Sequence, residues 1–426
     1  MSEQGSAGIL AGYRVLELTT TVAGPFCGRL LADFGAEVIK VEPPRGDELR
    51  AIGRHFEGKS LYAASLFRNK SLIALDWRSE AGQEVVRRLA RQCHIVVENF
   101  RPGTLERWNL GYEALSEHNP GLVMVRISSY GQTGPYRDRP GYGVVAEAVS
   151  GLRQVMGEPD LPPTRVAIPL TDYITGLYGA FGAVMALLHS QRTGVGQVVD
   201  AALYEGGFSF MEPAVPAFQK LGMVPMRAGS RMPGTSPNNL YVTRDGGHLL
   251  IAAVSQAVFG RLATAMGRPD LADDPRFATG PARTENDEAL DAIVAQWCGE
   301  RTLEELEAIL HDAEVPATRI FSIADIFANP HYQARDMLVD VPDEEWGSVK
   351  QVAPVPRFSR TPGRVSWSGR NVGQDTVRIL TAFGGYSEAE AERLREQGVV
   401  FFDSSAAEKT VPGKRASRSP TRGGKG

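Results

Sequence analysis

The sequence has little cysteine, little net charge and no long uninterrupted apolar run. Its 426 residues include three cysteines, Cys27, Cys93 and Cys298, which stand far apart without C-x-x-C spacing. This spacing argues against a disulfide framework or a zinc site and is typical of a reduced, cytosolic protein. The formal charge of −4 and the Gly, Pro and charged residues that interrupt the apolar stretches give no sign of nucleic acid or membrane as the main ligand. We therefore expect a cytoplasmic protein with a small-molecule partner.

Several catalytic and cofactor motifs are also absent. The sequence has no G-x-G-x-x-G fingerprint, no P-loop, no G-x-S-x-G elbow and no H-E-x-x-H. A Rossmann dinucleotide site, a P-loop, a serine hydrolase and a zinc protease are therefore poorly supported. The seven histidines are scattered, which disfavours catalysis by histidine or by a metal. The beginning, MSEQGSAGIL, lacks a basic segment followed by a long apolar core, so we expect no secretory signal.

The apolar runs that are present predict an α/β fold. YRVLEL at 13–18 is typical of a buried strand, a helical pattern starts at Phe26, and AEVIKVE at 36–42 predicts a second strand. Further β-branched runs follow at 94–99 and 122–128. Strands that alternate with helices indicate a largely parallel sheet covered on both faces.

A change of composition at residue 223 predicts a domain boundary. MVPMRAGSRMPGTSPNN is rich in Gly, Pro and Ser and precedes the hairpin-like YVTRDGGHLLIAA, while TLEELEAILHDA has the spacing of a capping box. We predict a large domain over 8–222, a small α+β domain over 223–337 and a return to the large domain over 338–402. The basic, proline-containing tail over 403–426 is expected to be disordered.

One carboxylate, Asp172, precedes an apolar segment with helical periodicity. The small residues on this predicted helix form a ridge made of Gly176, Gly179, Ala183 and Ala186. Asp172 by itself is explained as an N-cap that accepts a backbone N–H. The same position also favours the ionised carboxylate, which is the form that acts as a nucleophile or a base. Both interpretations stay open at this point.

A turn and several basic residues are candidates for ligand binding. The turn LTTTVAGPFCG at 18–28 joins the first strand to a helix, which is where open α/β sheets bind ligands. If the basic residues near the strand ends converge, they suit an anion with several phosphates, and if they do not, they are ordinary solvated side chains. These residues are Lys40, Lys70, Arg101, Arg107, Arg137 and Arg139.

Taken together, these segments resemble the class III CoA-transferases, the family of formyl-CoA and carnitine CoA-transferases. The resemblance rests on LELTTTVAGPFCGRLLADFGAEVIKVEPPRGDELR, FRNKSLIALD, VENFRPGTLERWNLGY, SSYGQTGPYRDRPGY, TDYITGLYGA and RTGVGQVVDAALYE, which follow in family order from about residue 10 to about residue 400. It implies a Rossmann-like large domain with a parallel sheet, a smaller α+β domain, and an interlocked dimer of identical or closely related chains.

The resemblance also implies a mechanism centred on Asp172. Its carboxylate attacks an acyl-CoA thioester to give an aspartyl-acyl anhydride, the CoA thiolate then forms an aspartyl-CoA thioester, and the acceptor acid completes the exchange. Both intermediates are activated acyl compounds, so transfer needs no ATP as long as water is excluded. No metal or redox cofactor is expected, since the coenzyme A thioester is itself a substrate.

By position, the resemblance assigns residues to a CoA site and an acyl site. The expected CoA-binding residues are Thr21, Val22, Ala23, Lys70, Asn99, Phe100, Arg101 and Arg107, with Phe100 packed on the adenine. Tyr130 and Gln132 are expected near the acyl group. The Gly-Ser-rich segment 228–236 resembles in place, though not in sequence, a glycine loop that covers the site in formyl-CoA transferases.

The segments RDRPGY and TDYITGLYGA look nearer to relatives that use succinyl-CoA and small dicarboxylates than to oxalate enzymes. Arg137, Arg139 or Arg165 then binds the distal carboxylate of the substrate, unless these arginines are merely solvated. We expect succinyl-CoA as donor and malate, citramalate, itaconate, glutarate or a related acid as acceptor. The alternatives are a formyl-CoA:oxalate-type transferase, an α-methylacyl-CoA racemase, a non-catalytic CoA-binding protein and an NAD dehydrogenase. The histidine expected of a racemase is replaced here by Tyr142 and Gly143.

Overall fold

The computed structural model describes residues 8–402 and divides the chain into two compact units. The first, which we call the large unit, contains residues 8–138, 175–201 and 340–402. The second, the small unit, contains residues 139–174 and 202–339. The domain boundaries expected from the sequence remain predictions, and the tail over 403–426 lies outside the described residues.

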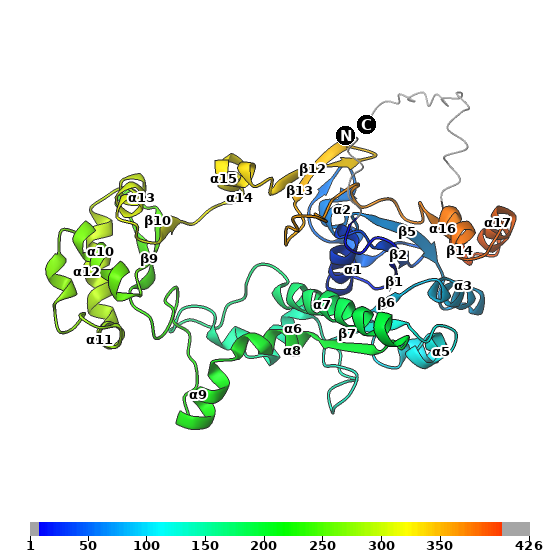
Figure 1. Cartoon of the computed structure of the whole chain (residues 1–426), viewed down its shortest axis with the longest axis horizontal. Helices are drawn as coiled ribbons and strands as arrows, with labels where there is room; N and C mark the ends of the chain where they lie inside the picture. Colours follow the sequence, from blue (N-terminus) through cyan, green and yellow to red (C-terminus); the bar gives the residue numbers. More distant parts are fainter. Residues whose placement is uncertain (1–7, 403–426) are drawn as a thin grey trace, which may run out of the picture. The chain divides into compact units, whose positions relative to one another are not determined.

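The large unit is built on a seven-stranded sheet of order β14-β5-β2-β1-β6-β7-β8. The pairings from β5 through β2, β1 and β6 to β7 are parallel, whereas β14 pairs antiparallel with β5. The predicted α/β class with a largely parallel sheet is therefore confirmed (Figure 1). In sheet order the strands are Val400–Phe401, Lys70–Leu75, Glu37–Glu42, Arg14–Leu18, Ile95–Glu98, Val123–Ser128 and Val198–Ala202.

The side chains of successive strand residues point alternately into the apolar layers on the two faces of this sheet. On one face, Leu16 and Leu18 of β1 share a buried cluster with Leu105 of α4 (Thr104–Arg107) and with side chains from four longer helices. These helices are α3 (Glu80–Arg91), α5 (Tyr112–Ser116), α16 (Thr376–Ala382) and α17 (Glu388–Glu396). The remaining short elements of this unit are β3 (His55–Phe56), β4 (Lys59–Ser60), α2 (Leu61–Leu66), β12 (Leu338–Asp343) and β13 (Gly347–Val352).

Helices α1 (Ala23–Asp33) and α7 (Leu170–Thr193) pack together in the second apolar layer. A Cβ added to Gly176 of α7 would lie 2.6 Å from the carbonyl oxygen of Ala23, and one added to Gly179 would lie 3.3 Å from Cys27 Sγ. The two glycines of the small-residue ridge predicted on α7 thus lie on the surface that receives α1. By length and composition α7 is also apolar enough to cross a membrane, which is weak evidence for a span, and half of its most apolar window is buried within the structure.

The position at which α7 begins contradicts the interpretation of Asp172 as an N-cap. The helix begins at Leu170, so Asp172 lies within its first turn and is not the N-cap. The cause is that the chain becomes helical at Leu170, three residues before the periodic apolar pattern begins at Tyr173. The dipole argument is unaffected, because it applies to the whole first turn.

The small unit has its own core between helices and the antiparallel sheet β11-β10-β9. The predicted hairpin is confirmed by the pairing of β9 with β10, and the predicted capping box by the reciprocal bonds of Thr302 and Glu305. The strands are β9 (Asn238–Val242), β10 (His248–Ala252) and β11 (Ala317–Arg319). The helices are α6 (Gly143–Val149), α8 (Leu203–Phe208), α9 (Ala214–Leu221), α10 (Gln256–Ala265), α11 (Gly280–Glu285), α12 (Asp287–Gly299), α13 (Leu303–Asp312), α14 (Ile323–Ala328) and α15 (Pro330–Ala334).

Candidate active site

Asp172 has its carboxylate against the backbone of Gly143, the first residue of α6. A Cβ on Gly143 would lie only 1.8 Å from Asp172 Oδ2, so any side chain there would displace the carboxylate. The neighbouring Thr171 donates a hydrogen bond of 2.8 Å from Oγ1 to the carbonyl oxygen of Gly143. These contacts fix the beginning of α6 beside the first turn of α7 and leave the Asp172 carboxylate few alternative positions.

The environment of Asp172 changes its acidity. Burial raises its pKa to about 6, while its own backbone N–H and the charge of Arg165 act in the opposite direction. At pH 7 about nine-tenths of such a group is ionised, and its basicity exceeds that of an ordinary aspartate. A half-buried carboxylate of this kind is suited to act as a nucleophile.

The turn after β1, predicted to contact CoA, has a strained backbone. Thr21 has a φ of 67°, in the left-handed region that β-branched residues seldom adopt. Its N–H donates to Asp47 Oδ1 at 3.0 Å. The preceding Thr20 exchanges two hydrogen bonds with the Asn99 side chain, at 2.9 and 2.8 Å. Such strain persists only where the surroundings enforce it, and it is concentrated at functional sites.

Four charged side chains form a buried cluster beneath this turn. Lys70 Nζ lies 2.7 Å from Glu17 Oε2, and Lys40 Nζ lies 3.3 Å from Glu17 Oε1 and 2.8 Å from Asp47 Oδ2. All four side chains are fully shielded from solvent. We call this set the charge cluster. The two ammonium groups also donate to backbone carbonyl oxygens in the segment above, Lys40 to Thr19 and Lys70 to Pro25.

The charge cluster changes how Lys40 and Lys70 are interpreted. Both were candidates for contact with phosphates, but their ammonium groups are buried and act on the turn from below. For Lys70, burial lowers the pKa to about 8, with Glu17 opposing the shift. For Lys40, burial acts in the same direction but is outweighed by Asp47, Glu17 and Glu42, so its pKa is raised. A role of Lys70 in CoA binding remains a prediction; in this conformation it supports the turn.

The residues predicted around the nucleotide occupy the segment after β6. The ring of Phe100 packs edge-to-face between Trp77 and Trp108, with centroid distances of 5.5 Å to each. Arg101 is exposed, and Arg107 donates to Thr104 Oγ1 at 3.0 Å. The structure therefore places Phe100 in an aromatic group at the edge of the core, and its stacking on adenine remains a prediction.

Sequence reasoning missed several buried charged residues of the large unit. Arg126 of β7 lies 2.7 Å from both Glu98 Oε1 and Glu106 Oε1, and burial raises the pKa of Glu98 to about 7. Glu17 and Asp47 were missed in the same way. The available signal was the charge itself, since Glu17, Glu98 and Arg126 interrupt strands that are otherwise apolar, and buried charges need partners.

The residues predicted near the acyl group lie on the loop after β7. The backbone N–H of Gln132 donates a 2.8 Å hydrogen bond to Asp200 Oδ2. Its buried side-chain Nε2 has no hydrogen-bond partner among residues 8–402. The rings of Tyr130 and Tyr136 pack edge-to-face at 5.7 Å. Arg137 is exposed, and its Nε lies 3.4 Å from Oδ2 of the adjacent Asp138. These residues belong to the large unit, whereas Arg139, Arg165 and Asp172 belong to the small unit.

The predicted lid segment, 228–236, forms no helix or strand. It is fastened to the loop at 154–159 by a 3.0 Å bond from the N–H of Gly229 to the Gly157 carbonyl oxygen. The preceding Arg227 donates to the carbonyl oxygens of Gln154, Glu158 and Pro159. Among the described residues no group of three or more His, Cys, Asp or Glu is arranged to hold a metal ion.

Comparison with known proteins shows that this chain is similar to CoA-transferases. A family model described as CoA-transferase family III matches residues 10–376. A succinyl-CoA–D-citramalate CoA-transferase of Chloroflexus aurantiacus is 46% identical over 94% of this chain and 100% of its own length. The succinyl-CoA–L-malate CoA-transferase beta subunit of the same organism is 39% identical over 92% of this chain and 98% of its own. A CAIB/BAIF family protein from Brucella suis superposes with a TM-score of 0.79, at 34% identity, over 88% of this chain and all of that one.

Proposed function

The chain belongs to CoA-transferase family III, and from this premise we propose that it moves CoA from succinyl-CoA to a small dicarboxylate through covalent intermediates on Asp172. The observation that carries the proposal is the half-buried Asp172 carboxylate, held against Gly143 with a raised pKa. The names of the relatives support succinyl-CoA as donor and citramalate or malate as acceptor.

The proposed reaction balances without a cofactor. An Asp172 oxygen attacks the thioester carbon, the C–S bond breaks, and CoA leaves as thiolate, giving an aspartyl-succinyl anhydride. The thiolate attacks the aspartyl carbon, which releases succinate and forms an aspartyl-CoA thioester. The acceptor carboxylate attacks that thioester to give a new anhydride, and the released thiolate takes the acceptor acyl group. Asp172 returns as a carboxylate, and no water is consumed.

We assign the CoA moiety to the turn at Thr19–Ala23 and the segment after β6. The left-handed backbone of Thr21 and the bonds from Thr20 to Asn99 support this assignment, since both hold the backbone of the turn in one conformation. Arg101, Arg107 and the other residues predicted there are proposed to contact the nucleotide. Coenzyme A thioesters are the substrates of this family, and we propose no metal or redox cofactor.

For the distal carboxylate of the dicarboxylate we favour Arg165 over Arg137 and Arg139. Arg165 is exposed, and its charge already acts on Asp172, which supports a position near the reacting carboxyl group. A racemase is disfavoured because the segment has Tyr142 and Gly143 where its histidine is expected, and a side chain at Gly143 would meet the Asp172 carboxylate.

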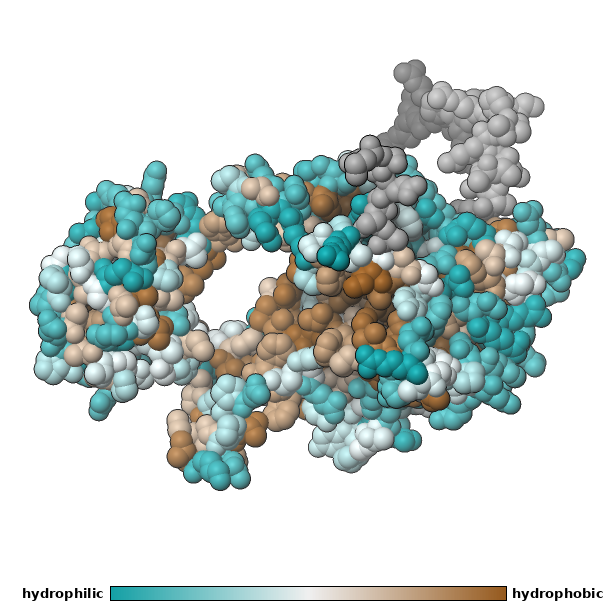
Figure 2. Space-filling model, viewed as in Figure 1, coloured by the Kyte–Doolittle hydropathy of each residue, from teal (hydrophilic) through white to brown (hydrophobic). Residues whose placement is uncertain are grey.

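We also propose that the chain works in the cytoplasm as a homodimer or as a heteromer with a close relative. Helix α7 carries a row of apolar side chains that are 43–58% exposed in the single chain, and Figure 2 shows the brown surface over this helix. The row consists of Leu177, Tyr178, Phe181, Met185 and Leu188. An apolar face of this extent is best covered by another protein surface. The beta-subunit name of one relative is the reason for retaining the heteromer.

A transfer assay tests the proposal. Purified protein would be mixed with succinyl-CoA and, separately, citramalate, malate, itaconate, glutarate and oxalate, and new acyl-CoAs would be identified by mass. We expect turnover with one or more C4–C5 dicarboxylates, and loss of turnover in Asp172→Asn and Asp172→Ala. Asp160→Asn, which changes an exposed aspartate of the small unit, serves as the matched control.

Trapping identifies the intermediate itself. Borohydride or hydroxylamine should modify Asp172 only when succinyl-CoA is present, and peptide mass spectrometry would locate the modification. Full turnover by Asp172→Asn, with conversion back to aspartate excluded by mass, would rule out the covalent mechanism. Loss of α-deuterium from a chiral acyl-CoA without any acceptor acid would favour the racemase.

A further inference from the structure

A cavity of about 520 Å³ in the large unit lies at the opposite edge of the sheet from the proposed CoA turn. It is lined by the beginnings of β2 and β5, at Glu37 and Ser71, and by residues between 362 and 370. The CoA turn follows the end of β1, which runs parallel to β2 with Arg14 opposite Glu37. Four residue steps along β1 therefore separate the two places by roughly 13 Å. The volume is typical of sites for small molecules.

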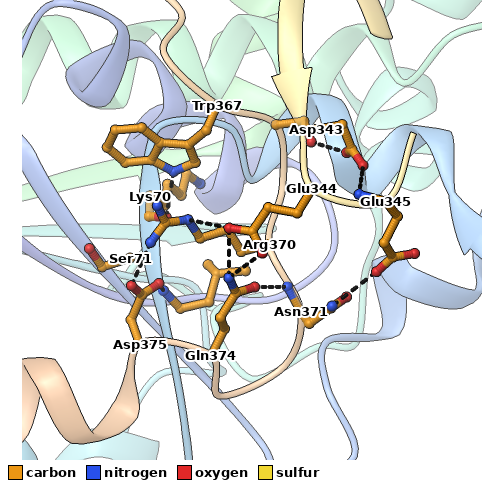
Figure 3. A network of polar contacts seen from close by, with 12 residues as sticks. Lys70, Ser71, Asp343, Glu344, Glu345, Trp367, Arg370, Asn371, Gln374 and Asp375 are labelled. Carbon is orange, nitrogen blue, oxygen red and sulfur yellow. Dashed lines mark hydrogen bonds and ion pairs between the residues drawn. The ribbon is translucent and has the colours of Figure 1, made fainter. Parts of the chain in front are cut away.

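The wall of this cavity carries an excess of positive charge. Arg370 Nη1 and Arg378 Nη2 share a single carboxylate oxygen of Asp375, at 2.6 and 3.0 Å. The other oxygen of Asp375 accepts the N–H of Leu72 at 2.9 Å. Figure 3 shows Arg370 between Asp375 and the Glu344–Gln374 pair, beside Lys70 and Ser71. One Asp375 oxygen thus serves two guanidinium groups, and the other carboxylate beside them, Glu344, lies 3.9 Å from Arg370 Nε and does not line the cavity.

The two acidic residues that line the cavity, Asp33 and Glu37, add no free negative charge to it. Asp33 accepts bonds from Arg68 on both carboxylate oxygens, and Glu37 lies 3.0 Å from Arg14. Each is therefore already neutralised by an arginine outside the cavity lining. A bound cation would find no free carboxylate here, whereas an anion would meet arginines only partly neutralised.

Two arginines of the lining also have unused donors. Within residues 8–402 the exposed guanidinium of Arg364 makes no hydrogen bond or ion pair. The buried Nε of Arg370 has no hydrogen-bond partner in the same part of the chain, and Glu344 Oε1 is 3.9 Å from it. A buried guanidinium N–H without an acceptor is costly, so a ligand oxygen at this place would remove an existing penalty.

We propose that this cavity binds a small organic polyanion, with two or more phosphate or carboxylate groups, as a ligand separate from the acyl-CoA substrate. Guanidinium groups bind both kinds of group through paired N–H donors. The volume exceeds the needs of one inorganic ion, so an organic skeleton is required to fill it. The indole of Trp367, fixed by a 3.1 Å bond from Nε1 to the Lys70 carbonyl oxygen, supplies an aromatic wall for that skeleton.

Isothermal titration of the full-length protein with ATP and with citrate tests this proposal. The titrations would contain saturating CoA, so that binding of ATP at the CoA turn is suppressed. We expect at least one probe to bind, and Arg364→Glu to weaken that binding at least tenfold. Binding of ATP alone would indicate a phosphorylated ligand, and binding of citrate alone a polycarboxylate. Arg276→Glu, a charge reversal at an exposed arginine of the small unit, should bind like the wild type.

Controls separate loss of the site from loss of the fold. Arg364 has no side-chain partner among the described residues, so Arg364→Glu should retain the wild-type melting temperature and the wild-type transferase rate without probe. Arg378→Gln is a second test, with the melting temperature measured because its contacts to Ser71 and Asp375 are also removed. Absence of heat with both probes, equal affinity in Arg364→Glu, or displacement of the probe by CoA would each overturn the proposal.

Discussion

The backbone of Gly143 touches the carboxylate of Asp172 so closely that a Cβ on the glycine would lie 1.8 Å from Asp172 Oδ2. No ordinary Cβ contact is this short, so the carboxylate would have to move if Gly143 were replaced. A displacement of about 1 Å at a reacting atom can cost about 100-fold in rate. The contact therefore makes Gly143 a positioning residue for the proposed nucleophile.

We expect Gly143→Ala to lower kcat about 100-fold, because the new methyl group pushes the Asp172 carboxylate from its position. Steady-state kinetics with succinyl-CoA would measure this loss, and circular dichroism would check the fold. Gly260→Ala is the matched control, since Gly260 is also helical and a Cβ there meets nothing within 4 Å. It should keep full activity and gain up to about 1 kcal/mol in stability. Wild-type kcat in Gly143→Ala would contradict the proposed positioning.

The pH dependence of transfer should follow the ionisation of Asp172. Its pKa is raised to about 6, and only the ionised form attacks the thioester, so kcat/KM should be constant above pH 7 and fall about tenfold per pH unit below pH 6. The contribution of Asp172 to the free energy of unfolding depends on pH in the opposite direction. The folded state binds the proton more tightly than the unfolded chain, so this group favours folding below pH 4 and loses that contribution as the pH rises through 6.

Arg165 lowers the pKa of Asp172, and its removal should therefore shift the pH profile. In Arg165→Gln we expect the midpoint of the acid limb of kcat/KM to move to higher pH. If Arg165 also binds the distal carboxylate, the KM for the acceptor acid should rise while the KM for succinyl-CoA changes less. A profile and acceptor KM identical to those of the wild type would exclude both roles.

Asp47→Ala should weaken both the fold and CoA binding. The change removes the acceptor of the Thr21 N–H and leaves the buried Lys40 without its 2.8 Å partner. Breaking a buried ion pair typically costs about 3 to 5 kcal/mol, which urea unfolding would measure, and the KM for succinyl-CoA should rise. Asp340→Ala is the control, since the exposed pair of Asp340 with Lys350 should contribute less than about 1 kcal/mol. A loss equal to that of the control would show that the charge cluster does not support the turn.

The apolar row on α7 should lie in an interface between chains. We expect the wild type to sediment as a dimer and Phe181→Glu, which places a charge at a 58% exposed apolar position, to dissociate. Gln191→Glu changes an exposed polar residue of the same helix and should leave the assembly intact. A monomeric wild type would refute the proposed dimer.

The strands of the large sheet were predictable because their apolar runs are long and bounded by clear breaks. β2 and β7 fall within the predicted segments, and the alternation of strands and helices gave the parallel pairing. The start of α7 was missed by three residues because Leu170, Thr171 and Asp172 carry no periodic signal of their own.

The candidate site was less accessible to sequence reasoning. Asp172 could be singled out from its place before a helical segment, but its contact with Gly143 joins residues 29 positions apart and depends on how α6 and α7 pack. Lys40 and Lys70 were candidates either for phosphate contact or for ordinary solvated side chains, because a lysine near a strand end is usually exposed. Burial depends on tertiary contacts with Glu17 and Asp47 that no local pattern encodes.

The left-handed Thr21 has a consequence for the thermodynamics of substrate capture. The charge cluster and Asn99 hold this turn in its unusual conformation while no ligand is bound. The conformational entropy of the turn is therefore lost when the chain folds and, if the turn binds CoA as proposed, need not be lost again on each encounter with an acyl-CoA. Preorganisation of this kind raises affinity without adding a single contact to the ligand.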